Sequence, residues 1–242
     1  MEDLLLYLIL IVLSIVQSIF GVGILLFGTP TLIYLDYSFI NTLNILIPCS
    51  LLISFFQFNF NNKSIKKNKY FKKNFFFYCI SSIFLSLLIL SKYSNNLNFE
   101  KLIGTTLILI LFIKIFGYLT KNFNLFLNKY HKFVNFMIGL IHGITNMGGS
   151  FLTIYISELE KNDLFQRRYL IGYSYFFMAS TQLFSLILSG NLIISKKILI
   201  YILITTVGYF LTKIILKKID INKHNLLFNI ILLFYALLLL TK

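Results

Sequence analysis

Apolar runs long enough to cross a bilayer recur from one end of the 242-residue chain to the other, and they limit the possible folds more than any other feature. A membrane-spanning helix needs about 20 apolar residues. Runs of roughly this length occupy residues 4–35, 39–60, 75–90, 102–119, 133–157, 170–188, 198–216 and 226–240. Short clusters rich in Lys and Asn separate them. The sequence therefore predicts an all-α integral membrane protein, a polytopic bundle of about eight transmembrane helices.

Composition also favours a membrane protein and argues against one that binds nucleic acid. Hydrophobic residues make up 58% of the chain, whereas soluble domains are typically about 45–50% apolar. The formal net charge is +14, but the lysines lie mainly between apolar runs, as the positive-inside bias and anionic lipids favour. We expect the lipid bilayer as a partner, no nucleic acid, and a multi-pass location in the prokaryotic plasma membrane. If eight spans cross, a narrow charge bias favours cytoplasmic termini.

The N-terminal segment does not have the pattern of a cleaved leader. Glu2 and Asp3 stand where a signal peptide has basic residues, and no small-residue cleavage site follows. We therefore expect the first span to be retained. Cys49 and Cys79 fall within predicted spans, where we expect small buried core residues and no disulfide framework.

A shift of 125 residues aligns the two halves of the chain and keeps the order of the apolar runs. The aligned pairs are Gly21 with Asn146, Gly23 with Gly148, Gln17 with His142, and Gln57 with Gln182. We expect two four-span repeats at residues 1–120 and 133–242, joined by a linker at 121–132. Four crossings per half would make the repeats parallel, whereas an odd number, with a re-entrant segment, would invert them.

Both halves interrupt an apolar run in the same relative place. The segment HGITNMGGSFL at 142–152 puts polar and small residues inside one run, and GVGILLFGTP at 21–30 breaks another. A helix in a bilayer is interrupted only where protein or a water-filled cavity satisfies the backbone. Glycine lets the chain turn and approach a ligand, and a restarting helix offers a positive dipole end to anions. The matched breaks predict a shared cavity.

Packing is the competing interpretation for several of these residues. Gly139 and Gly143 have the small-xxx-small spacing of close helix contacts. Uncharged polar residues such as Gln57 and Gln182 often only join neighbouring helices. His142, which lies alone inside a span, either carries a proton or binds an anion, or is a neutral hydrogen-bonding residue at a helix interface.

The placement of the acidic residues separates the remaining classes of function. All eight lie at predicted span ends or in loops, whereas cation carriers and proton pumps need a carboxylate inside the membrane. An interior rich in donors and free of acids favours an anion. A membrane-embedded enzyme with His142 as base would need a carboxylate cluster, and a structural or assembly subunit without cargo would leave the matched breaks unexplained. Both stay as alternatives to a carrier.

The two broken segments resemble the signatures of the TauE/SafE family of sulfite and organosulfur-anion exporters. GVGILLFGTPTLIYL, with Gly21, Gly23 and Pro30, is similar to the first signature, a glycine cluster followed by a proline. GLIHGITNMGGSFL is similar to the second, in which spaced glycines lead into a glycine run. Two departures are the replacement of part of the first glycine run by Ile24 and Leu25, and the absence of a proline after Ser150. The resemblance implies secondary transport of a small sulfur-containing or related anion.

The combined expectation is a secondary transporter whose small anionic substrate binds near the midplane, where the two breaks meet. The candidate substrate-binding residues are Gln17, Gly21, Gly23, Pro30, Gln57, His142, Gly143, Asn146, Gly148, Gly149, Ser150 and Gln182. We expect no catalytic residue, no metal site and no cofactor.

Overall fold

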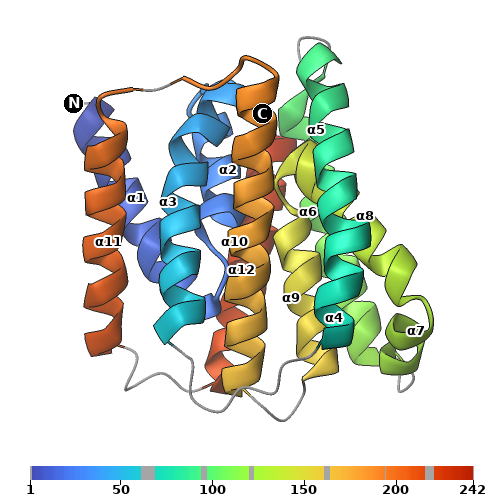
Figure 1. The fold of residues 1–242 in the computed structure, drawn as a ribbon. Coiled ribbons are helices and arrows are strands. Elements are labelled where there is room, and N and C mark those ends of the chain that lie inside the picture. Colours follow the sequence, from blue (N-terminus) through green and yellow to red (C-terminus); the bar gives the residue numbers. More distant parts are fainter. Residues whose placement is uncertain are drawn as a thin grey trace.

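The computed structural model describes residues 2–60, 69–93, 97–119, 123–160, 164–193, 195–215 and 221–241. All regular structure in these ranges is helical (Figure 1), which confirms the all-α part of the predicted fold class. The helices are α1 (Glu2–Phe20), α2 (Ile24–Tyr34), α3 (Phe39–Phe60), α4 (Lys69–Asn74), the π-helix η1 (Phe75–Ile80), α5 (Ser81–Tyr93), α6 (Phe99–Leu119), α7 (Phe123–Lys129), α8 (His131–Thr145), α9 (Gly148–Leu159), α10 (Leu164–Leu188), α11 (Ile198–Ile215) and α12 (Ile221–Leu240).

Contacts between helix termini define two ends of the bundle. At the terminal end, uppermost in Figure 1, Lys197 before α11 forms an ion pair with Asp3 of α1, with Nζ and Oδ1 2.7 Å apart. The hydrogen bond to Asp3 raises the pKa of Lys197. At the opposite end, Lys72 of α4 donates a hydrogen bond to the hydroxyl of Tyr169 near the start of α10, at 2.9 Å.

Helices α1 and α2 form a hairpin that enters and leaves at the terminal end. The predicted break is present, with α1 ending at Phe20 and α2 beginning at Ile24. The chain then turns back, so that Leu5 and Leu6 of α1 line a surface recess of about 420 Å³ together with residues 35–38, which follow α2. The first apolar run is therefore a helical hairpin whose two outer ends lie together at the terminal end of the bundle.

Helices α8 and α9 form a second hairpin, which enters from the opposite end. α8 starts beside α4, and its break follows at Asn146 and Met147. α9 then runs back until its Tyr155 lies beside Phe71 of α4, with ring centroids 6.1 Å apart. The two hairpins thus approach the interior of the bundle from opposite ends.

Between the hairpins, α3 and α10 cross the bundle side by side in opposite directions (Figure 1). Asn44 near the start of α3 donates to the carbonyl of Asn191, just past the end of α10, at 3.0 Å. Phe58 near the end of α3 packs against Tyr173 near the start of α10, with ring centroids 6.3 Å apart. Outside this pair, α11 packs beside α1, α5 beside α8, and α12 beside α6.

The outer surface of the bundle is apolar, as lipid contact requires. Leu199, Phe77 and Phe112 are 68%, 69% and 66% exposed, and soluble monomers rarely expose extended apolar patches. Four helical segments among the described residues have the length and composition to cross a membrane: Asp3–Phe20, Phe39–Asn59, Phe71–Leu90 and Gln166–Leu188. The sequence predicts about eight, so the structure supports a helical membrane bundle but not that count.

Candidate functional site

Gln17 and two glycines build the turn of the first hairpin. Gly21 has φ +81°, and its N–H donates to the carbonyl of Gln17 at 2.8 Å, which closes the end of α1. A Cβ at Gly23 would come within 2.5 Å of the backbone nitrogen of Gln17. The side chain of Gln17 accepts a hydrogen bond from the N–H of Ile24 at 3.0 Å and so caps the start of α2. Gln57 of α3 donates to the Gln17 carbonyl at 2.7 Å.

The turn of the second hairpin repeats this geometry with different residues. Asn146 has φ +65°, and its N–H donates to the carbonyl of His142 at 2.8 Å. A Cβ at Gly148 would come within 2.5 Å of the Cβ of His142. Ser150 donates from its hydroxyl to the carbonyl of Met147 at 2.7 Å, within the first turn of α9.

Asn146 connects the two hairpins to each other and to α10. Its Nδ2 donates to the hydroxyl of Thr29 in α2 at 2.8 Å, and its Oδ1 accepts from Nε2 of Gln182 in α10 at 2.9 Å. Gly21, in the other turn, lies against Ile171 of α10, where a Cβ would come within 3.1 Å of the isoleucine Cγ2. The two turns therefore both lie against α10 in the interior, at Ile171 and at Gln182, positions that a helical rise of about 16 Å separates.

His142 and Tyr175 bring unused polar groups to the second turn and the start of α9. Both side chains are fully buried, and their rings lie edge to face with centroids 6.3 Å apart. Within the part of the chain that the structure describes, the two ring nitrogens of His142 make no hydrogen bond. The hydroxyl of Tyr175 makes none there either. The Gln182 side chain lies beside the His142 ring, but without the geometry of a hydrogen bond. Buried polar groups are normally satisfied, so this cluster has capacity for a ligand.

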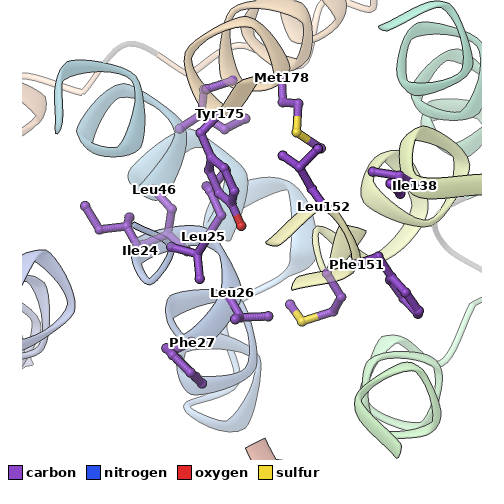
Figure 2. Close-up of a cluster of buried hydrophobic side chains, with 14 of the residues drawn as sticks. Ile24, Leu25, Leu26, Phe27, Leu46, Ile138, Phe151, Leu152, Tyr175 and Met178 are labelled. Carbon is purple, nitrogen blue, oxygen red and sulfur yellow. The ribbon is translucent and has the colours of Figure 1, made fainter. Parts of the chain in front are cut away.

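Tyr175 also limits the space around the site. A Cβ at Gly149 would overlap its hydroxyl, so glycine is needed where α9 passes α10. Figure 2 shows the Tyr175 hydroxyl directed toward Leu25 of α2 and Leu152 of α9, which belong to the surrounding apolar cluster. Tyr175 is absent from the sequence-based candidates. Its spacing of seven residues from Gln182, which places both on one face of a helix, is the signal that would have found it.

Two predicted candidates stand apart from the contacts at the turns. Gly143 packs against α5, where a Cβ would overlap the hydroxyl oxygen of Ser86; this contact gives it the packing role that its spacing from Gly139 allows. Pro30 is buried inside α2, where it removes one backbone donor from the helix. The other ten candidates lie in the two turns, in the first turn of α9, or on α3 and α10 beside them.

The candidate site is closed to solvent in this conformation. All twelve predicted residues are buried, and the surface recess described above lies at the terminal end, away from the turns. Within the described ranges no group of three or more His, Cys, Asp or Glu side chains is placed to hold a metal ion. Cys49 and Cys79 are free and buried, as the sequence predicts.

The fold and the buried polar cluster define a polytopic helical membrane protein of the transporter class. The family model described as "Sulfite exporter TauE/SafE" matches residues 6–239, nearly the whole chain. The chain therefore belongs to the TauE/SafE family of membrane transporters, as the two glycine motifs predict. A search of the curated proteins found no significant match, and a search of the solved structures found none either.

Proposed function

We propose that this protein is a secondary transporter that binds a small sulfur oxyanion, sulfite or an organosulfonate, between its two hairpin turns. One observation carries the proposal: Asn146 joins Thr29 of one hairpin to Gln182 beside the other, next to the unused polar groups of His142 and Tyr175. The amides of Asn146 and Gln182, the imidazole of His142 and the phenol of Tyr175 can donate hydrogen bonds to an oxyanion, whereas the Thr29 hydroxyl already donates to the Leu25 carbonyl at 2.7 Å. The starts of α2 and α9 add the positive ends of two helix dipoles.

The charges around the site favour an anion over a cation. No Asp or Glu is found among the buried residues that the structure describes. A cation inside a membrane protein would need such a carboxylate or a ring of carbonyls. Amide, hydroxyl and imidazole groups instead match the acceptor oxygens of a sulfite or sulfonate. The family assignment supports the sulfur oxyanion within the wider class of small anions.

Two inverted repeats, residues 1–120 and 133–242 with the linker at 121–132, are part of this proposal. Each would contain one re-entrant hairpin and three crossings: α3, α5 and α6 in the first, α10, α11 and α12 in the second. The exchange of partners supports it, because α1 packs on α11 while its counterpart α8 packs on α5. A site at the interface of inverted repeats can open alternately to either side when one repeat rocks against the other.

The direction of the hairpins also changes the expected orientation in the membrane. Among the described residues, the opposite end carries Lys72, Lys73, Lys129, Lys132, Arg167 and Arg168. The described cations at the terminal end are Lys92, Lys101, Lys196 and Lys197. By the positive-inside rule we propose a cytoplasmic opposite end and external termini, in the plasma membrane. The sequence-based bias toward cytoplasmic termini assumed that both hairpins cross.

Flux of labelled sulfite into proteoliposomes tests the proposed function. The wild type should exchange internal for external sulfite, and Asn146→Leu should reduce the rate at least tenfold, because it removes both side-chain links at the site. Asn128→Leu is the matched control, since Asn128 is exposed on α7 and its side chain donates a hydrogen bond to Asn124 of the same helix. The proposal would be contradicted if vesicles with folded wild-type protein transported sulfite and sulfonates no faster than empty vesicles.

A further inference from the structure

We propose that His142 takes up one proton when the anion binds, so that anion and proton occupy the closed site together. This inference rests on the proposed anion-binding function and specifies what accompanies the substrate. It starts from a difference between the halves. Gln17 uses its side chain to cap Ile24 and to reach Ser54 at 3.2 Å, whereas His142, at the aligned position, leaves both ring nitrogens unused within the described structure.

The need for a proton follows from the cost of burying charge. An ion in a low-dielectric interior without a counter-charge costs several kcal/mol. Asn146, Gln182 and Tyr175 supply neutral groups, which can solvate an anion but cannot neutralise it. His142 is fully buried, and it is the side chain of this cluster that can accept a positive charge near neutral pH.

The neighbours of His142 leave it as the proton acceptor. On α8 and the elements packed against it, the described titratable or charged side chains are His131, Lys132, Lys72, Lys73, Tyr78, Cys79, Glu100, Lys101, Lys114, Lys129, Tyr155, Glu158, Arg167, Arg168, Tyr169, Tyr173 and Tyr175. Of these, Tyr175 is the one whose ring the structure places against His142. A phenol has an ordinary pKa near 10, so Tyr175 keeps its proton and serves as a donor.

The proton balance of the step is simple. A proton from water binds one ring nitrogen of His142, both ring nitrogens then carry hydrogen, and the imidazolium faces the anion. When the anion leaves, the proton returns to water on the same side. A monoanion would cross with no net charge, and the combined gradients of anion and proton would set the direction of net flux.

The pH dependence of binding tests the inference on the full-length protein in detergent. Thiosulfate, which stays fully ionised above about pH 6, and sulfite serve as probes. If one proton is taken up per anion, the affinity should weaken about tenfold for each pH unit above neutrality. His142→Gln keeps a hydrogen-bond donor but cannot be protonated, so its thiosulfate affinity should not change with pH. Sulfite itself titrates in this range, so its slope is compared between wild type and variant.

Two further measurements keep the test decisive. Tyr175→Phe removes a hydroxyl but no titrating group, so it should weaken binding and retain the wild-type slope. Calorimetric titration of the wild type in buffers of different ionisation enthalpy should give about one proton taken up per anion, whether or not the His142 variant folds. Binding with no proton uptake would overturn the inference and leave the transporter intact. Absence of binding by either probe at any pH would instead remove the proposed function.

Discussion

Asn146 has two roles, which different parts of the residue perform. Its backbone ends α8 in the left-handed region, with φ +65°, where Gly and Asn are the residues usually found. Its side chain joins Thr29 to Gln182 across the site. Since Gly lacks the side chain but tolerates this backbone, substitution can separate the two roles.

Replacing Asn146 by Gly should keep the turn and abolish transport, whereas Asn146→Leu should also strain the backbone. A left-handed conformation costs a residue with a Cβ about 1–2 kcal/mol. The free energy of unfolding, measured by denaturant titration in detergent, should therefore be lower for Asn146→Leu than for Asn146→Gly by about that amount. Equal stabilities would contradict the role of the left-handed turn.

Gly143 should prove to be a packing residue and not a substrate ligand. Gly143→Ala should destabilise the protein by about 1–3 kcal/mol, because the new Cβ overpacks against the Ser86 hydroxyl. In a Ser86→Gly background the same substitution should cost much less, and the double variant should transport sulfite. A double-mutant cycle of unfolding free energies measures this coupling. Additive costs, or lost transport in a stable double variant, would place Gly143 at the site.

At the residue scale, sequence alone located the turns but not all of the side chains around them. Gly21, Gly23, Asn146 and Gly148 break an apolar pattern, so they are visible in the sequence. Tyr175 lies in an apolar, aromatic-rich run, where its hydroxyl carries no pattern of its own. Only the packing of α10 against Gly149 shows that this hydroxyl lies at the site.

At the element scale, the breaks were predictable and the direction of the chain after them was not. Apolar periodicity reports burial, and it is the same for a helix that continues and for one that returns. The reversal depends on tertiary contacts, such as those between the start of α1 and residues 35–38 after α2. Re-entrant backbone inside a bilayer is tolerated because protein surrounds it, and all of residues 21–30 are buried here.

Both ends of the first hairpin should be accessible from the same side of the membrane. Asp3→Cys and Ser38→Cys, each placed in a Cys49→Ala/Cys79→Ala background, should react with a membrane-impermeant thiol reagent from one common side. Lys129→Cys, on α7 at the opposite end, is the control and should react from the other side. Labelling of residues 3 and 38 from different sides would show that the first apolar run crosses the membrane.

At the scale of the whole molecule, the two hairpins enter from opposite ends and make the halves inverted in the proposed arrangement. The same helix interface is then built twice with its residues exchanged. Gly208 of α11 packs against Ser14 of α1, and Gly139 of α8, aligned with Ser14, packs against Ser82 of α5. Because glycine and serine exchange places, the two halves share few identical residues at this interface. The repeat is therefore visible in the order of the helices and not in sequence identity.

The proposed orientation predicts which end faces the cytoplasm. In intact cells, Lys196→Cys at the terminal end should react with an impermeant thiol reagent, and Lys129→Cys should react only after permeabilisation. The physical reason is the excess of Lys and Arg at the opposite end, which the positive-inside bias retains in the cytoplasm. The reverse labelling pattern would show that the termini are cytoplasmic and that the charge-based orientation is wrong.

The most direct test of the central claim, anion binding between the two hairpin turns, is thermal unfolding of the purified protein with a panel of sulfite, thiosulfate, sulfoacetate, taurine and chloride. A ligand that binds only the folded state adds about 2.7 kcal/mol at a hundredfold excess over its Kd. We predict that a sulfur oxyanion raises the unfolding temperature of the wild type and of Asn128→Leu, but not of Asn146→Gly. No shift with any of these anions, or an equal shift in Asn146→Gly, would contradict the proposed site.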